Sequence, residues 1–403
     1  MRLPPVLRDR RFSLLVSGQF VSALGDGMFP IAVAVALLNK HGAGAIASIL
    51  GARAIGALVG ILLGGALVDR FSRTRVMWVA DVVRLVAVGS MIWAVTLDTL
   101  LPANVCMTVV GLATSFFNPA FRALIPRTVP AGAVKQANSI NSTILQTATV
   151  CGPALAGALL AVSTPETILW INTASFALSV LTLLCIREQA AGPVDRRDSA
   201  LVTALGGLRA VAELRWLAAL VVTGVLQMAL AVAPWFTFLP VVSIEDYGSS
   251  GPYSMSMTAY AVGGIAGALL AGKVTPRLPG IAVIVGPCLF STILFCLASG
   301  VPAAVLVLVH LIAGAGLQFS GVFQMTAIHE QVPDHLLGRV MSLMMLGGAL
   351  LTPISYGLMG GLADAFGSRT VLAVGGALAT VILLLPLLLP DFRRLSNARQ
   401  KVG

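Results

Sequence analysis

The chain has 403 residues, of which 57% are hydrophobic and only 10% are charged. A soluble domain carries roughly a quarter charged residues, so a water-soluble enzyme, a nucleic-acid-binding protein and a disordered protein are excluded as classes. The net charge of +10 is better explained by the cationic cytoplasmic loops of a membrane protein than by nucleic acid.

Apolar segments that are long enough to cross a bilayer recur along the whole chain. A spanning helix needs about 20 apolar residues, and unpaired backbone groups are costly in lipid, so each segment is predicted to be helical. The sequence therefore predicts an all-α membrane protein with twelve transmembrane helices. We expect them at residues 12–38, 45–68, 76–97, 101–122, 138–163, 166–187, 214–242, 253–273, 280–300, 303–326, 338–363 and 370–390.

The positions of Lys and Arg predict the orientation, because these residues are enriched in cytoplasmic loops. With the N-terminus in the cytoplasm, the cytoplasmic segments hold 22 of the 26 basic residues. Of the other four, Lys40 and Arg369 fall outside, whereas Arg53 and Arg84 lie within spans. We therefore expect both termini to be cytoplasmic.

The longest polar interruption, residues 188–213, predicts a cytoplasmic linker between two six-helix bundles, residues 1–187 and 214–403. The two halves match as repeats at an offset of 203 residues. Two like bundles joined by a linker can rock about a site between them, as in many secondary transporters. The matched pairs include Leu155 with Leu358, Gly157 with Gly360, Gly64 with Gly267, and Arg70 with Lys273.

Asp26 is the strongest functional candidate, since a charge at the centre of a membrane helix costs roughly 2.5–3.5 kcal/mol. Gln19, Ser22 and Asp26 follow an i, i+3, i+7 spacing that places them on one helix face. Asp26 and Arg53 have similar predicted depths in neighbouring spans. We expect them to pair or to couple, so that their separation drives proton uptake by Asp26. The alternative is a permanent ion pair that only fixes the packing.

Asp81 and Arg84 lie three residues apart, close to the predicted cytoplasmic end of the third span. We expect them either to pair with each other or to extend a charged cluster at the cytoplasmic surface. Arg122, at the inner end of the fourth span, is a further candidate for this cluster.

Polar side chains within other spans are candidates for substrate binding. The fifth span carries such residues at helical spacing, and this stripe either lines a cavity or packs against other helices. His310 is expected to be a satisfied structural group. Trp235, Phe236 and Phe238 are expected to anchor the seventh span at the membrane interface, with an outer gate or a hydrophobic substrate wall as the alternative. The substrate-binding candidates besides Gln19, Ser22 and Asp26 are Asn141, Gln146, Thr149, Gln227, Gln318 and Tyr356.

The connection between the second and third spans, GGALVDRFSRTR at residues 64–75, resembles the signature loop of the major facilitator superfamily. It departs from that pattern at Ser72, where the family usually has glycine. The resemblance implies a cytoplasmic charge latch that forms in one conformation and breaks in the other. The alternative is a cationic cytoplasmic loop without such a role. The latch candidates are Gly65, Asp69, Arg70, Arg73 and Arg75, together with Asp81, Arg84 and Arg122.

A second motif in the fifth span, Gly152, Pro153 and Gly157, resembles part of the antiporter motif of drug exporters. The same residues also permit close packing and a bend in a membrane helix. Longer stretches, such as residues 117–130 and 338–343, are similar to the bacterial branch that contains the enterobactin exporter and macrolide efflux proteins.

The resemblance implies a proton-coupled antiporter of the bacterial inner membrane that exports a small apolar or amphiphilic compound, such as an antibiotic, a siderophore or a secondary metabolite. A lysophospholipid flippase and a proton symporter are the alternatives. The sequence has no nucleotide-binding loop, so ATP is not expected to drive transport directly. We expect no enzymatic activity, cofactor, metal or nucleic-acid partner. The expected partners are the substrate, protons and the lipid bilayer, and we expect a monomer.

Overall fold

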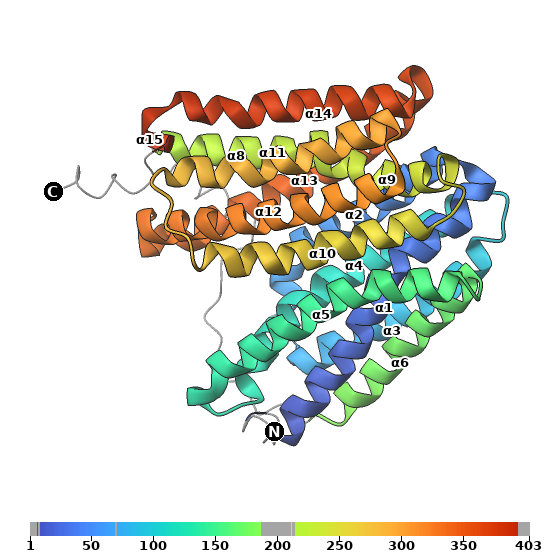
Figure 1. Cartoon of the computed structure of the whole chain (residues 1–403). Helices are drawn as coiled ribbons and strands as arrows, with labels where there is room; N and C mark the ends of the chain where they lie inside the picture. Colours follow the sequence, from blue (N-terminus) through green and yellow to red (C-terminus); the bar gives the residue numbers. More distant parts are fainter. Residues whose placement is uncertain (1–5, 7–8, 69–70, 187–210, 212–213, 394–403) are drawn as a thin grey trace. The chain divides into compact units, whose positions relative to one another are not determined.

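The computed structural model describes residues 6, 9–68, 71–186, 211 and 214–393 (Figure 1). Within these residues, the secondary structure is helical throughout, and twelve helical segments are long and apolar enough to cross a membrane. This confirms the predicted all-α membrane fold. The chain divides into two compact units, Met1–Ser199 and Ala200–Gly403, which we call unit 1 and unit 2. The linker predicted at residues 188–213 lies outside the described residues, apart from residue 211.

Unit 1 contains the first six spans. The carboxylate of Asp9 caps the first helix by accepting a hydrogen bond from the backbone N–H of Arg11 at 2.8 Å. Gly42 alone separates the first two helices, and its φ of 71° favours glycine. The spans are α1 (Arg10–His41), α2 (Ala43–Val68), α3 (Arg73–Ala94), α4 (Leu101–Leu124), α5 (Val134–Leu160) and α6 (Pro165–Leu184).

Unit 2 contains the other six spans. The seventh span is built from α8 (Arg215–Gln227), a π-helical turn (Met228–Val232) and α9 (Ala233–Glu245). Pro234 lies two residues after the end of this turn, and its missing N–H cannot continue the α-helical hydrogen-bond pattern. The remaining spans are α10 (Gly251–Ala271), α11 (Pro279–Ser299), α12 (Ala303–Gln331), α13 (Asp334–Phe366) and α14 (Ser368–Leu384), which is followed by the short helix α15 (Pro390–Arg393).

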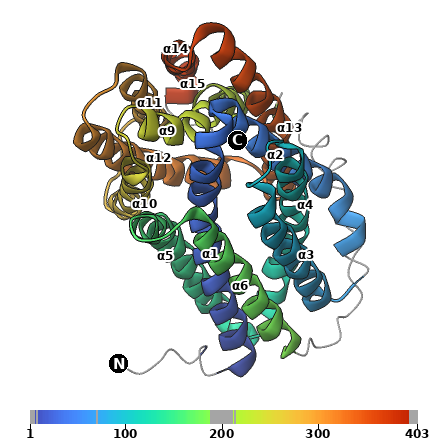
Figure 2. The ribbon, with the colours of Figure 1, turned by 90° about the vertical axis from the view of Figure 1, so that its right-hand side faces the viewer.

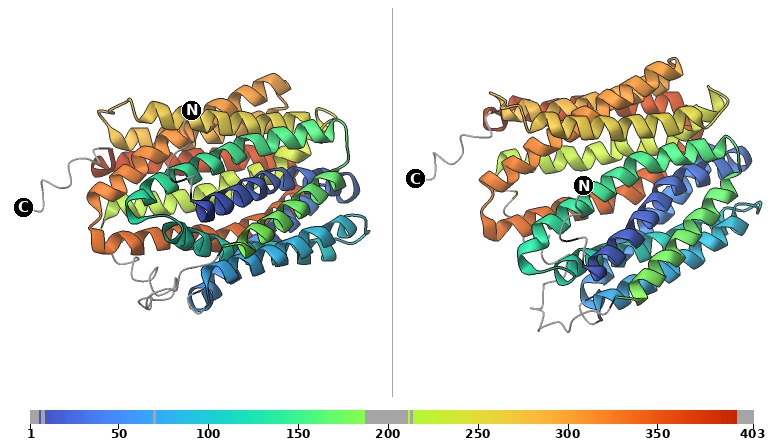
Figure 3. Two further views of the ribbon diagram at one scale, coloured as in Figure 1. Left: turned by 90° about the horizontal axis from the view of Figure 1, so that it is seen from below. Right: turned by 60° about the horizontal axis from the view of Figure 1, so that its bottom comes forward.

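The two units share one packing pattern. In unit 1, α1 lies between α5 and α6, and α4 packs against both α2 and α3 (Figure 2). In unit 2, the seventh span contacts α13 and α14, and α12 packs against both α10 and α11. Within each unit the long helices run alongside one another (Figure 3). Equivalent helices therefore make equivalent contacts, as expected for a duplicated bundle.

Glycines at matching contacts correct the predicted repeat register. Gly111 on α4 lies against the backbone carbonyl of Arg53, and Gly314 on α12 lies in the same way against the carbonyl of Tyr260. Gly111 and Gly314 are 203 residues apart, but Arg53 and Tyr260 are 207 apart. The second and eighth spans are thus offset by one further helical turn. The predicted match of Gly64 with Gly267 is therefore wrong, and that of Arg70 with Lys273 involves a residue outside the described part of the chain.

Two aromatic residues of the seventh span, Trp235 and Phe238, lie in the interior of unit 2. Trp235 is 2% exposed and Phe238 is fully buried, so the prediction that they anchor the span at the membrane interface is wrong. The indole N–H of Trp235 donates to Nε2 of His310 at 3.0 Å, and Nδ1 of His310 lies 2.7 Å from the carbonyl oxygen of Leu306. Both ring nitrogens of His310 are satisfied, in agreement with its predicted structural role.

Candidate functional site

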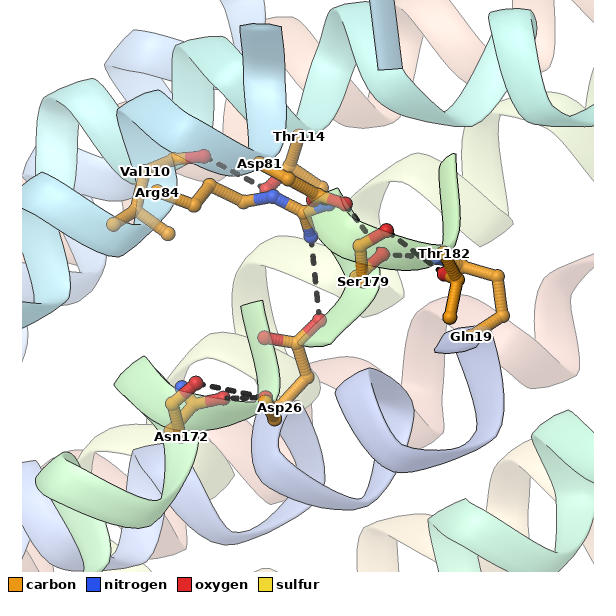
Figure 4. Close-up of polar contacts among 10 residues, drawn as sticks. Gln19, Asp26, Asp81, Arg84, Val110, Thr114, Asn172, Ser179 and Thr182 are labelled. Atoms are coloured by element: carbon orange, nitrogen blue, oxygen red, sulfur yellow. Dashed lines mark hydrogen bonds and ion pairs between the residues drawn. The ribbon is translucent and has the colours of Figure 1, made fainter. Parts of the chain in front are cut away.

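The most distinctive feature of unit 1 is a guanidinium held between two carboxylates at the middle of the bundle. Arg84 on α3 contacts Asp81, three residues earlier on the same helix. An Nη1 atom of Arg84 also lies 3.5 Å from Oδ2 of Asp26 on α1. Figure 4 shows the three side chains converging from the two helices. The sequence predicted the Asp81–Arg84 pair, but placed it closer to the cytoplasmic end of α3.

Glycines on α1 allow the neighbouring helices to close around Asp26. A Cβ at Gly25 would overlap the side chain of Asn172 on α6. On the other flank of Asp26, a Cβ at Gly152 of α5 would lie 2.8 Å from Cα of Gly27. Since real Cβ atoms do not approach this closely, the backbone contact of Gly152 with Gly27 requires glycine, and a Cβ at Gly25 would displace the side chain of Asn172. Gly152, the first glycine of the predicted antiporter motif, thus packs against α1 directly beside Asp26.

The helix α6 supplies hydrogen bonds that hold Asp81. The hydroxyl of Ser179 donates to Oδ2 of Asp81 at 2.6 Å, and Nε2 of Gln19 donates to the Ser179 hydroxyl oxygen at 3.3 Å (Figure 4). Gln19 and Ser22 on α1 are both buried. These contacts give Gln19 a supporting place in the cluster, and the predicted role of Gln19 and Ser22 in substrate binding stays a prediction.

Two aromatic rings cover the guanidinium of Arg84. Its Cζ lies 4.3 Å from the ring centre of Phe117 on α4 and 4.6 Å from that of Phe176 on α6. A desolvated cation–π contact is worth about 2 kcal/mol, which offsets part of the cost of burying the charge. The side chain of Arg84 is 4% exposed. Its contacts on four helices make it the centre of the cluster.

The two carboxylates differ in their access to solvent. Asp81 is fully buried, whereas the side chain of Asp26 is 40% exposed. Asp26 also makes the longer contact with Arg84. Two carboxylates and one guanidinium carry a formal charge of −1, and one proton would neutralise the cluster. Asp26 is the more exposed of the two carboxylates.

The direct pairing predicted for Asp26 and Arg53 is wrong, since the structure pairs Asp26 with Arg84. The alternative, that the two residues couple, is supported, because the charge of Arg53 still acts on Asp26. The predicted depths were similar, but successive helices need not be neighbours along their length. The helix α1 packs mainly against α5 and α6, whereas α2 lies along α4, where Gly111 meets the backbone of Arg53. Among the described residues, no ion pair is found for Arg53.

The other predicted substrate-binding residues are distributed over both units. On α5, Gln146 and Thr149 are exposed and Asn141 is half-buried. Because an exposed polar face is costly in lipid, this side of α5 is suited to a water-filled space. In unit 2, Gln318 is exposed and Tyr356 is buried. Gln227 lies immediately before the π-helical turn, and its buried amide nitrogen has no hydrogen-bond partner among the described residues.

The predicted latch lies only partly within the described residues. Asp69 and Arg70 are outside them, and Gly65 belongs to the last turns of α2. Arg73 is buried and donates to the carbonyl oxygen of Phe71 at 3.1 Å. Arg75 and Arg122 are both exposed. Asp81 and Arg84 join Asp26 in mid-helix instead of extending a surface cluster. Of the antiporter-motif residues, Gly152 and Pro153 are buried and Gly157 is half-buried.

Several members of the cluster were not predicted. Ser179, Phe117 and Phe176 contact its charged groups, yet none was a candidate. The polar residues of α6 carried a usable signal, because Asn172, Ser175 and Ser179 follow an i, i+3, i+7 spacing that defines one face. The two phenylalanines carried no such signal, because apolar residues surround them in sequence.

Comparison with known proteins agrees with this architecture. Residues 15–356 match the Major Facilitator Superfamily. The chain is 27% identical to the multidrug efflux pump Tap of Mycobacterium tuberculosis, covering 96% of this chain and 95% of that protein. It is 26% identical to the enterobactin exporter EntS of Citrobacter koseri, covering 95% and 92%.

Solved structures show the same fold at low sequence identity. The nucleoside transporter NupG superposes with a TM-score of 0.72 at 13% identity, covering 94% of this chain and 98% of NupG. A bacterial homologue of the iron transporter ferroportin gives a TM-score of 0.71 at 18% identity, covering 94% and 98%. A D-xylose–proton symporter gives 0.65 at 15% identity, covering 92% and 96%.

Proposed function

The chain belongs to the Major Facilitator Superfamily and is a membrane transporter, and we propose that it is a proton-coupled antiporter that exports a small apolar or amphiphilic compound by alternating access. The observation that carries the proposal is the cluster of Asp26, Asp81 and Arg84. Charged residues within membrane spans are costly and usually have a function, and proton relay is one such function.

Asp26 is the proposed proton carrier. In the ionised state its carboxylate is attracted to Arg84, which holds α1 against α3. Protonation removes the charge of Asp26 and weakens that attraction, while Asp81 keeps Arg84 in place. The movement of α1 relative to α3 is thereby linked to proton uptake and release, and such a two-state element is what coupling between proton and substrate requires.

The driving force is sufficient for concentrative export. The membrane potential supplies about 2.3 kcal/mol per charge for each 100 mV. One proton per cycle therefore supports a substrate gradient of some tens-fold before any pH difference is added, since about 1.4 kcal/mol corresponds to a factor of ten.

Export and an amphiphilic substrate are proposed from the relatives. Tap is named as a multidrug efflux pump and EntS as an exporter, and both resemble this chain over nearly its whole length. The exposed polar face of α5, with Gln146 and Thr149, is a suitable surface for a substrate that keeps part of its hydration. We also propose that both termini are cytoplasmic in the bacterial inner membrane, which reporter fusions at each end would test.

The test is accumulation of a fluorescent amphiphile, ethidium, and of a panel of antibiotics and siderophores in cells that lack or overproduce the protein. We expect overproducing cells to accumulate less of at least one compound, and a protonophore to abolish the difference. An equal difference with and without the protonophore would overturn proton coupling. Inward transport with protons in reconstituted vesicles would instead indicate a symporter, and movement of lysophospholipid alone would indicate a flippase.

A further inference from the structure

Unit 1 has a pocket that is separate from the charged cluster. It has a volume of about 350 Å³ and lies between α3 and α4. Val79 and Val83 of α3 and Phe116 of α4 form its apolar walls, and Phe71 lies beside the start of α3. Arg75, in the first turn of α3, borders the pocket with its aliphatic stem, because the lining is almost wholly apolar. An apolar pocket bordered by the stem of a cationic side chain matches an amphiphile with an anionic head group.

The surroundings of the pocket are suited to lipid. Val79 is 42% exposed and Phe71 is 46% exposed, and Val86, further along α3, is 58% exposed. Exposed apolar side chains on a membrane helix face acyl chains. The pocket is therefore open to lipid along the helix, and Arg75 lies where α3 approaches the membrane surface.

The charge at this end of unit 1 is strongly positive. The start of α1, the start of α3 and the end of α4 meet there, and Arg10, Arg75 and Arg122 are exposed on them. Asp9 is the acidic residue that the described part of unit 1 places at this end, and its carboxylate caps α1. Among the described residues, no carboxylate forms an ion pair with Arg75.

We propose that this pocket binds an anionic glycerophospholipid, with one acyl chain between α3 and α4 and its phosphate against Arg75. Acyl chains in the bilayer are as apolar as the pocket walls, so burial gives little preference among lipids. The guanidinium provides the preference, because it forms charge-assisted hydrogen bonds with a phosphate and attracts a head group of net negative charge. Binding at this site does not depend on the proposed transport reaction.

The experiment is native mass spectrometry of the purified full chain after delipidation, titrated with dioleoylphosphatidylglycerol or dioleoylphosphatidylcholine. Val79→Trp fills the pocket, and Val82→Trp is the matched control, because Val82 lies on the same helix, is exposed and does not line the pocket. Arg75→Gln removes the head-group contact, and Arg75→Lys keeps the charge. Thermal unfolding of each variant confirms that it is folded.

We expect the wild type and Val82→Trp to bind the anionic lipid at least fivefold more tightly than the zwitterionic one at one site. Val79→Trp should lose that site, Arg75→Gln should lose the preference, and Arg75→Lys should retain most of it. Equal lipid binding by Val79→Trp and Val82→Trp would overturn the pocket as the site. An unchanged preference in Arg75→Gln would overturn the role of the guanidinium. Binding of inorganic phosphate alone as tightly as the anionic lipid would show that the acyl chain contributes nothing and would overturn the proposal.

Discussion

Oδ2 of Asp26 on α1 lies 3.5 Å from Nη1 of Arg84 on α3, and Arg84 is held on its other side by Asp81. The first and third spans are thus joined by the ion pair of Asp26 with Arg84. In this pair Arg84 is held by Asp81, and Asp26 is partly exposed. Because Asp81 would still form an ion pair with Arg84, Asp26 can change its protonation state without leaving the guanidinium without a carboxylate partner. This asymmetry makes Asp26 the expected site of proton exchange.

Removal of the central cation should destabilise unit 1. Arg84→Gln leaves Asp81 fully buried without its partner, and breaking a buried ion pair costs about 3–5 kcal/mol. We expect a clear fall in the thermal unfolding temperature of the purified protein. The double variant Asp81→Asn with Arg84→Gln removes the orphaned charge and should recover part of the loss. If the double variant is instead less stable than Arg84→Gln, removal of the orphaned charge gives no recovery, and the two residues do not act as a pair.

Close contacts between helices should not tolerate even one added methyl group. A Cβ at Gly314 would overlap the backbone carbonyl of Tyr260, so Gly314→Ala forces α10 away from α12. Overpacking of this kind costs about 1–3 kcal/mol. Gly321 lies on the same helix, and a Cβ added there would meet open space, so Gly321→Ala is the matched control and should be neutral or slightly stabilising. Unfolding temperatures of the two variants test this, and equal effects would contradict the packing.

A surface ion pair at the far end of unit 1 should make a small, pH-dependent contribution to stability. Nζ of Lys40 lies 2.8 Å from a carboxylate oxygen of Asp98, in the connection between α3 and α4. The hydrogen bond and charge of Lys40 lower the pKa of Asp98 below its ordinary value of 3.8.

A lowered pKa in the folded state means that the contribution is complete above the ordinary value and is lost as the pH falls through the lowered one. The difference in unfolding temperature between the wild type and Asp98→Asn should therefore shrink as the pH is reduced from neutrality to below 3.8. A difference that grows toward acid would contradict the assignment. The pair is exposed, so the effect at neutral pH should be small.

The buried hydrogen bond from Ser179 to Asp81 should contribute measurably to the cluster. Ser179→Ala removes a donor to a fully buried carboxylate, and a hydrogen bond to a charged group contributes about 1.5–3 kcal/mol. Ser142→Ala on the exposed face of α5 is a suitable control and should change little. Equal unfolding temperatures for the two variants would show that Ser179 does not support Asp81.

The architecture could be predicted because it follows from composition and from the bilayer. The length of each apolar segment indicates where a span lies, and the polar groups of the backbone require each span to be helical. Asp26, Asp81 and Arg84 were identifiable for the same reason, since charges inside apolar segments are costly. The contact between Asp26 and Arg84 was not predictable, because the order of helices in sequence does not determine which ones lie side by side. The packing of α1 on α5 and α6 depends on small contacts such as Gly25 with Asn172.

The repeat register was misjudged for a related reason. Equivalent contacts in the two units differ by four residues between the second and eighth spans, as the pairs Gly111 with Arg53 and Gly314 with Tyr260 show. A shift of four residues keeps nearly the same helix face, so chance identities at the wrong register look plausible. Only the backbone contacts separate the two alignments.

Proton movement in reconstituted vesicles tests the role of Asp26 most directly. Proteoliposomes with an acidic interior and a trapped pH indicator are given external ethidium, and Asp26→Asn is compared with the wild type and with Asp26→Glu. We expect ethidium to raise the internal pH in the wild type and, more weakly, in Asp26→Glu. In Asp26→Asn the pH change should be absent, while exchange of internal for external ethidium continues. An undiminished, ethidium-dependent pH change in Asp26→Asn would contradict the account.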